Sequence, residues 1–247
     1  MGLMKRKKND TAPVPARTVT VSVGGGEARV LAAGDRFGSV SSVEVIFVFD
    51  TTGSMYSKLP GLVECTVQMV NELGQVSVPW KVTAVPFGDL EIRGDTINDR
   101  LPWLDSVEPA RKLLMNLERN AGGGNGGESA FEALDLALRK EGGRSAMRVV
   151  VLITDEAAHQ KKFSARQMVE RVVDEDVLVY SIATHHGYYR EMAERTGGSF
   201  IPISHSVDAS AITEMFRRLG RDIARRSHKV LTAGGSPQAL RALEAGR

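Results

Sequence analysis

A run of β-branched and aromatic residues that ends in a cluster of oxygen-bearing side chains constrains this chain more than any other feature. The run extends from Val43 to Phe49 and is interrupted only by Glu44. A strand that is buried on both faces of a parallel sheet has such a near-continuous apolar sequence. We therefore predict a central strand, with the next residues at the sheet edge where open α/β folds bind ligands.

Three polar side chains follow this run at alternate positions, namely Asp50, Thr52 and Ser54, and Gly53 between them allows the chain to curl. Carboxylate and hydroxyl oxygens are hard donors, which suit Mg²⁺ or Ca²⁺ better than zinc. The same residue types are also common in turns and at helix N-termini. Taken by itself, the segment is compatible with a metal site and with an ordinary turn.

Two segments further along the chain favour the metal site. A second apolar run, from Met147 to Thr154, also ends in an acid, Asp155. A glycine-rich loop, 121–129, precedes an amphipathic helix. Because ligand sites of parallel sheets lie beyond the carboxyl ends of the strands, we expect all three segments to meet at one point.

At these residues the chain resembles the von Willebrand factor type A (VWA) domain. The metal-ion-dependent adhesion site of that family has the pattern Asp-x-Ser/Thr-x-Ser, followed by a Thr and then by an Asp. The resemblance covers about 43–226. It implies that the hydroxyls of Thr52 and Ser54 bind the metal, and that Asp50 and Asp155 act mostly through bound water.

The remaining ligand departs from the family pattern. The glycine loop and the segment after the second run resemble a VWA subgroup with GGGDxPE and TDxPPH, which are altered here to GGGNGGE and TDEAAH. The position of the family's Thr falls near Glu128, which we expect to replace it, with Ser129 as the alternative. A carboxylate at this position would bind the ion more tightly but would cancel more of its charge.

A magnesium ion held by a few protein oxygens keeps some exchangeable waters, so an Asp or Glu of a partner can complete its coordination shell. The resemblance implies a non-enzymatic, metal-dependent protein-protein interaction module, an adaptor that uses Mg²⁺, with Ca²⁺ or Mn²⁺ as alternatives. It also implies partners such as AAA+ ATPases, protein kinases or phosphatases, or a place in a bacterial stress or defence system. A structural domain with a degenerate site and a metal-dependent hydrolase are the other hypotheses.

The residues around the metal are expected to form a rim that contacts the partner. They are Gly53, Met55, Asn125, Ser129, Glu156 and His159. An acidic loop nearby has a spacing that fits no EF-hand, and we expect its side chains to be solvated. These side chains are Asp89, Glu91, Asp95 and Asp99.

Composition excludes several classes of partner. Of the 247 residues, 42% are hydrophobic, enough for a substantial core, and the formal net charge of +2 does not favour nucleic acid. The single cysteine, Cys65, is expected in the core. We find no secretory signal and no apolar segment that could span a membrane, and we expect a cytoplasmic protein.

Alternating strand and helix patterns predict an α/β fold with a doubly wound, mostly parallel central sheet and helices on both faces. We divide the chain into a disordered basic tail (1–16), a β-hairpin extension (17–42), a VWA domain (43–226) and a C-terminal tail (227–247) that could contain a short helix. Later strands are expected at 81–89, 147–154, 177–184 and 199–203, and helices from Pro60 onward and at 107–119, 128–141, 164–174, 188–196 and 208–226.

Overall fold

The apolar run at the start of the domain forms a central strand, β3, which spans Ser42–Asp50. The computed structural model describes residues 18–23, 26–31, 42–75, 79–122, 124, 126–143, 146–203 and 209–232, together with positions 237, 241 and 244. The basic tail that we predict at 1–16 lies outside these residues.

Among the described residues, β3 belongs to a sheet of five strands in the order β4-β3-β5-β6-β7, and every neighbouring pair is parallel. The other four strands are β4 (Trp80–Phe87), β5 (Ala146–Thr154), β6 (Leu178–Ala183) and β7 (Phe200–Pro202). The predicted parallel sheet is thus confirmed.

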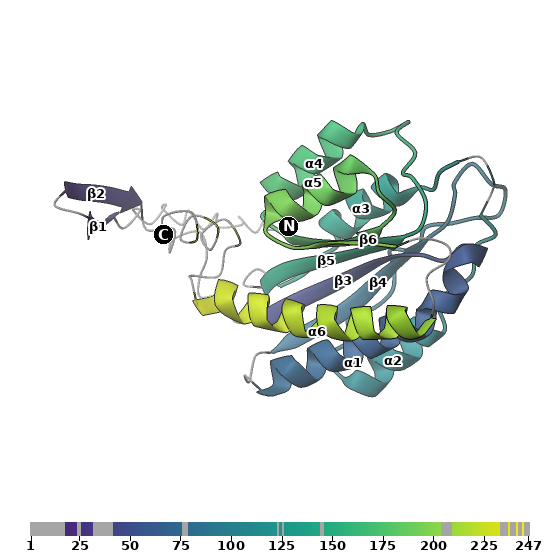
Figure 1. Ribbon diagram of the computed structural model, residues 1–247, viewed down its shortest axis with the longest axis horizontal. Coiled ribbons are helices and arrows are strands. Elements are labelled where there is room, and N and C mark those ends of the chain that lie inside the picture. Colours follow the sequence, from purple (N-terminus) through teal and green to yellow (C-terminus); the bar gives the residue numbers. More distant parts are fainter. Residues whose placement is uncertain are drawn as a thin grey trace, which may run out of the picture. The chain divides into compact units, whose positions relative to one another are not determined.

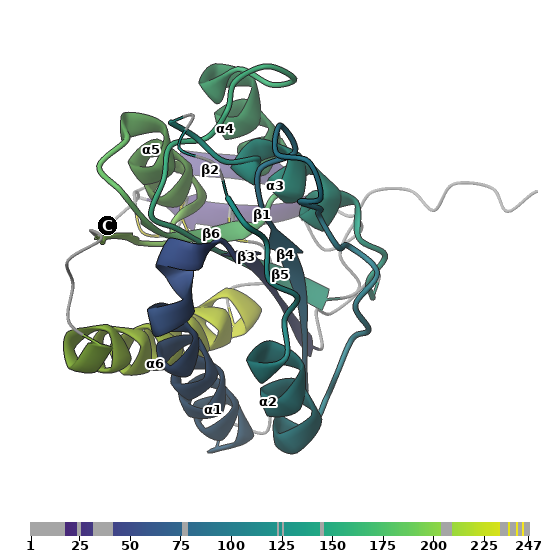
Figure 2. The same cartoon turned by 90° about the vertical axis from the view of Figure 1, so that its right-hand side faces the viewer.

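Helices cover both faces of this sheet (Figures 1 and 2). Helices α1 (Leu59–Gln75), α2 (Val107–Met115) and α6 (Ala209–Thr232) pack on one face. Helices α3 (Ala130–Arg139), α4 (Ala165–Asp174) and α5 (Gly187–Thr196) pack on the other. The predicted doubly wound architecture is confirmed.

Alternating residues of β3 contribute to the two layers of the core, as the period of a strand requires. Val45 and Phe47 face the layer of α1, α2 and α6, whereas Ile46 and Val48 face the layer of α3, α4 and α5. Cys65 of α1 is completely buried, and burial raises the pKa of its thiol. It is the core residue that we expected.

Local signals set two of the helix ends. Ser164 accepts a hydrogen bond from the backbone N–H of Gln167 in a capping box at the start of α4. At the end of α5, Gly197 has φ +84°, a left-handed conformation that glycine adopts without strain.

Three other helix ends differ from the prediction, two of them because of contacts to distant residues. Helix α2 ends at Met115 rather than at 119, and the backbone N–H of Asn120 donates instead to the carbonyl of Thr51. Helix α3 starts at Ala130 because Glu128 pairs with Ala158 in a parallel bridge. Helix α6 extends to Thr232, six residues beyond the predicted end at 226.

The outer edge of β4 is covered by the segment that follows it. Val82 and Leu104 exchange backbone hydrogen bonds, and the N–H of Asn98 donates to the carbonyl of Pro86. A proline is tolerated in an edge strand because no neighbouring strand needs its missing N–H. Strand β4 is thus an edge strand of the five-stranded sheet.

The N-terminal part of the chain forms a separate compact unit, Met1–Gly38, and the sheet belongs to the unit Ser39–Arg247. Within the first unit, β1 (Thr18–Val23) pairs antiparallel with β2 (Gly26–Leu31). The predicted hairpin is therefore a two-stranded sheet of its own.

Candidate metal site

The topology leaves a crevice at the carboxyl ends of β3 and β5. From β3 the chain passes outward to β4, and it then returns across β3 to form β5 on the other side. Ligands of open α/β sheets bind where the winding reverses in this way. Asp50 ends β3 and Asp155 directly follows β5, so both predicted acids lie at this point.

The Asp50 carboxylate is completely buried and is held by three hydrogen bonds. Its Oδ1 accepts from the backbone N–H of Thr52 at 2.9 Å and from the Thr52 hydroxyl at 2.6 Å. Its Oδ2 accepts from the hydroxyl of Thr154 at 2.8 Å. Burial nevertheless raises the pKa of Asp50 from 3.8 to about 6, although the bonds from Thr52 and Thr154 lower it.

A second carboxylate fixes the hydroxyl of Ser54. This hydroxyl donates to Oδ1 of Asp155 at 2.9 Å. The hydroxyls of Thr52 and Ser54 therefore both donate hydrogen bonds to carboxylates, to Asp50 and Asp155 respectively. Because a hydroxyl has two lone pairs in addition to its proton, each oxygen remains able to bind a cation.

A buried lysine also reaches this pair. The ammonium of Lys58 lies 2.9 Å from Oδ2 of Asp155 and donates to the backbone carbonyl of Ser54, also at 2.9 Å. Lys58 ends the 3₁₀-helix η2, Gly53–Lys58, and its side chain is only 2% exposed. One carboxylate of the site is thus paired with a lysine of the same chain.

The glycine loop is anchored by an acid that we expected to be solvated. Asp95 accepts hydrogen bonds from the backbone N–H groups of Asp89, Ala121 and Gly122, at 3.1, 2.8 and 2.9 Å. Asp89 is itself completely buried. The prediction of solvation is therefore wrong for these two acids, because they replace the missing backbone partners of a tight loop.

Close contact between this loop and the first motif explains one of its glycines. Gly122 has φ +71°, and a Cβ there would lie 2.9 Å from Cβ of Thr52 and 3.2 Å from Oε1 of Glu128. A larger residue would separate the loop from the hydroxyl of Thr52.

Glu128 carries the clearest sign of a missing partner. Its side chain is 4% exposed, and its Oε2 is buried without a hydrogen bond to any described residue. The pKa of Glu128 is raised to about 8, first by burial and then by the neighbouring charges of Asp50, Asp89 and Asp95. A buried, unpaired carboxylate among other acids is costly unless a cation joins them.

Thr52, Ser54 and Glu128 line one open pocket of about 270 Å³. Gly53, Gly122 and Glu156 also contribute to its wall. The described residues contain no group of three or more His, Cys, Asp or Glu side chains arranged to hold a metal ion. The donors here are instead two hydroxyls and one carboxylate, and this set of hard oxygens fits Mg²⁺.

The structure brings the five predicted metal residues, Asp50, Thr52, Ser54, Glu128 and Asp155, into one network around this pocket. The runner-up ligand, Ser129, is 2% exposed, and its hydroxyl accepts from the backbone N–H of Leu90. Ser129 is not among the residues that line the pocket, and its assignment as alternative ligand and rim residue stays a prediction.

The predicted partner-binding rim is only partly at the surface of the pocket. Gly53 and Glu156 line it, whereas Met55 is completely buried in the core and its assignment to the rim is wrong. The ring of His159 packs against Gly127, and its Nε2 lies 3.2 Å from Oδ1 of Asp89. Asn125 lies outside the described residues.

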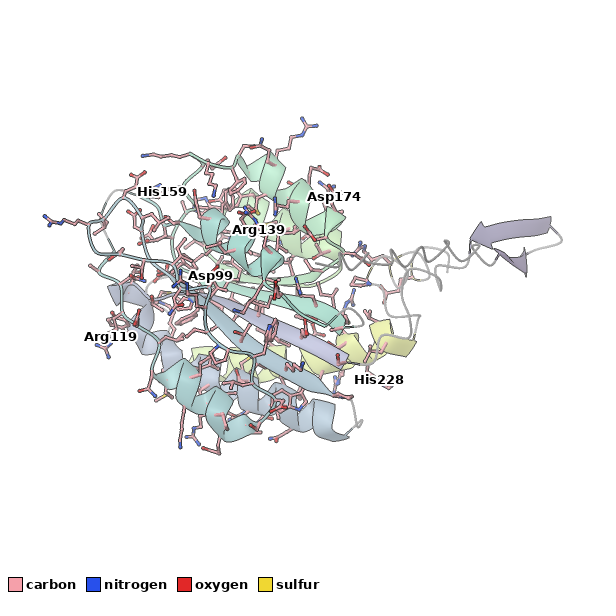
Figure 3. All side chains as sticks on the ribbon, turned by 180° about the vertical axis from the view of Figure 1, so that it is seen from behind. Asp99, Arg119, Arg139, His159, Asp174 and His228 are labelled. Atoms are coloured by element: carbon pink, nitrogen blue, oxygen red, sulfur yellow. The ribbon has the colours of Figure 1, made fainter. Side chains whose placement is uncertain are left out.

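His159 and Arg119, labelled in Figure 3, lie at the end of the domain that carries the pocket, and His228 lies toward the opposite end. The histidine belongs to the loop after β5, whose backbone is held by α5. Its neighbour Ala158 donates from its N–H to the hydroxyl of Tyr188, and Tyr189 donates to the carbonyl of Glu156. Helix α5 therefore positions one wall of the site.

Sequence reasoning missed four residues that support the site: Lys58, Thr154, Asp95 and Asn120. Asn120 is buried and donates from its amide to the hydroxyl of Thr51. Lys58 follows Ser54 by four residues, the spacing at which side chains meet on a helix, and this was a weak signal for it. For Thr154, Asp95 and Asn120 the chain offers no local pattern.

The fold and the rim site together define a doubly wound α/β domain with an oxygen-lined pocket at its switch point. The family model of the von Willebrand factor type A domain matches residues 44–216. The chain therefore belongs to this family, whose domains serve as protein-interaction modules.

Solved structures agree on the fold. A von Willebrand factor type A protein from Catenulispora acidiphila is 19% identical, with a TM-score of 0.51, over 73% of this chain and 42% of its own. Proximal thread matrix protein 1 from the mussel byssus is 14% identical, with a TM-score of 0.52, over 74% of this chain and 48% of its own. This chain thus spans less than half the length of either structure.

No curated protein matches the chain. Within the described residues, every helix is too short or too polar to cross a lipid bilayer.

Proposed function

We propose that this domain is a metal-dependent protein-interaction module. Thr52, Ser54 and Glu128 would bind a divalent cation, Mg²⁺ foremost, and Asp50 and Asp155 would orient the two hydroxyls and hold bound waters. When bound, the ion supplies a positively charged docking point with exchangeable waters, which an Asp or Glu of a partner can replace.

The buried, unpaired Oε2 of Glu128 carries this proposal. It belongs to the wall of a pocket in which the hydroxyls of Thr52 and Ser54 donate hydrogen bonds to other acids. Among the described residues Oε2 of Glu128 has no hydrogen-bond partner, and a cation would bind it together with the lone pairs of the two hydroxyl oxygens. The expected partner classes are AAA+ ATPases, protein kinases and phosphatases, in a bacterial stress or defence setting.

Calorimetric titration with Mg²⁺ tests the metal. We expect saturable binding to the wild type and a loss of at least ~10-fold in affinity for Ser54→Ala, because a direct ligand is removed. Ser57→Ala, an exposed serine of the same 3₁₀-helix, is the matched control and should bind as the wild type does. A wild type that takes up no Mg²⁺, Ca²⁺ or Mn²⁺ would instead support a structural domain with a degenerate site.

Affinity capture tests the partner. Immobilised wild-type and Ser54→Ala chains are exposed to extract with Mg²⁺ or with a chelator, and bound proteins are identified. A true partner is retained by the wild type with Mg²⁺ and is lost in the other three conditions. Hydrolysis of phosphate esters by the pure wild type, abolished in Asp155→Ala, would favour the hydrolase over the adaptor.

A further inference from the structure

The buried ammonium of Lys58 is a feature that the metal ligands by themselves do not explain. It contacts the carboxylate of Asp155 at 2.9 Å, and the same carboxylate accepts a hydrogen bond from the hydroxyl of Ser54. Both Lys58 and Asp155 are essentially inaccessible, at 2% and 0% exposure.

A gain in folding stability does not explain the ion pair of Lys58 and Asp155. Removing two charges from water is expensive, and a buried ion pair is often no more stabilising than apolar side chains of the same volume. Within η2, Lys58 and Met55 are the two buried residues, and Lys58 is the one that carries a charge. A function for the charge itself is the better explanation.

The charge balance of the site indicates that function. Asp50, Glu128 and Asp155 provide three carboxylates, and a divalent cation cancels two of these negative charges. The remaining negative charge would repel an acidic partner. The ammonium of Lys58 cancels it for these three carboxylates, while Asp89, Asp95 and Glu156 add further negative charge that acts on Glu128. Lys58 therefore lowers the net negative charge that an acidic partner meets at the ion.

We infer that Lys58 is an internal counter-charge that compensates for the carboxylate of Glu128 and so determines the specificity of the loaded site for an acidic ligand. This inference rests on the proposed function. The ammonium also repels the metal, so metal affinity is lower, and affinity for an anion on the metal higher, than without it.

The test measures two affinities for each variant. Mn²⁺ binding is followed by electron paramagnetic resonance, and acetate binding to the Mn²⁺-loaded chain by its displacement of metal-bound water in proton relaxation. Lys58→Met removes the charge and the hydrogen bonds, whereas Lys58→Gln keeps a donor and removes only the charge. We expect both to bind Mn²⁺ ~10-fold more tightly and acetate several-fold more weakly.

Two further variants complete the design. Lys58→Gln combined with Glu128→Gln restores the charge balance and should return acetate affinity to within ~3-fold of the wild type. Lys81→Met removes an equal charge from an exposed position near the start of β4, at the opposite end of the sheet, and should change neither affinity.

The outcomes separate the two claims. If the wild type binds no Mn²⁺, the proposed function fails. If it binds Mn²⁺ but Lys58→Met weakens that binding and Lys58→Gln rescues it, Lys58 only positions Asp155 and the inference is wrong. If the Lys58 variants do not fold, acetate binding to the loaded wild type decides, because an uncompensated site would reject it.

Discussion

At the scale of single residues, the site contains several carboxyl groups close together, and two of them have raised pKa values. Asp50 and Glu128 both have raised pKa values, about 6 and about 8, and burial is the first cause for each. Such groups hold protons more tightly in the folded chain than in the unfolded chain. Their contribution to stability is therefore fully present below their ordinary pKa values and is lost as pH rises through the raised ones.

This sign gives a testable prediction for the metal-free domain. Its free energy of unfolding should fall as pH rises from about 4 to about 8, because the folded state must give up protons that the unfolded state has already lost. Glu128→Gln should flatten the upper part of this slope, between about pH 5 and 8. Urea unfolding in chelator across this range measures both.

The exposed Glu108→Gln on α2 is the control, and it should leave the pH profile unchanged. A Glu128→Gln profile parallel to that of the wild type would contradict the raised pKa of Glu128. Adding Mg²⁺ should oppose the loss, since a bound cation requires deprotonated ligands and its affinity rises over the same range.

At the scale of elements, the glycine loop is held by an acid from a different segment. Asp95→Ala removes the acceptor for the N–H groups of Ala121 and Gly122. We expect a loss of about 1.5–3 kcal/mol, the usual effect of breaking hydrogen bonds to a charged group. Hydrogen exchange at these two amides should become faster.

Arg93→Ala, an exposed neighbour in the same loop, is the matched control and should preserve both stability and exchange protection. Unchanged protection of the amides of Ala121 and Gly122 in Asp95→Ala would show that the loop does not depend on this carboxylate.

The crossing of α1 and α6 depends on a glycine. A Cβ at Gly220 would lie 2.7 Å from the backbone carbonyl oxygen of Cys65 and 2.9 Å from the backbone nitrogen of Met69. Gly220→Ala gains up to ~1 kcal/mol of helix propensity, but overpacking costs ~1–3 kcal/mol. Because the contacts are with backbone atoms, we expect the cost of overpacking to exceed the gain in helix propensity. Urea unfolding should then show a net destabilisation of about 1–2 kcal/mol.

Gly187 at the start of α5 provides the comparison, because a Cβ there would meet nothing within 4 Å. Gly187→Ala should therefore be neutral or slightly stabilising. Equal stability of the two alanine variants would mean that the helices can separate at the crossing without cost.

At the scale of the whole domain, the proposed cation should stabilise the fold that assembles its site. The ligands come from the segments after β3, before α3 and after β5, so only the folded chain brings them together. At ~100 times its dissociation constant, Mg²⁺ should add ~2.7 kcal/mol. For a domain of this size the melting temperature would rise by about 5–11 °C.

Differential scanning calorimetry with Mg²⁺ or chelator measures this rise, and Ser54→Ala provides the comparison in which it should be small. An equal rise in both chains would place the stabilising ion elsewhere in the molecule.

Much of this architecture follows from the sequence by itself. The apolar runs of β3 and β5, the alternation of strands and helices and the Asp-x-Thr-x-Ser segment all depend on residues close together in the chain. Local pattern therefore predicted the parallel sheet and the position of Asp50, Thr52 and Ser54 at its edge, whereas Glu128 was expected from the family resemblance.

Only the tertiary structure decided which way the other side chains face. Met55 is in the core and Asp95 supports the glycine loop, although the sequence suggested a rim and a solvated acid. Lys58 pairs with Asp155, 97 positions away. Such outcomes depend on which distant segment supplies a hydrogen bond or a charge to a buried group, and no local pattern contains that information.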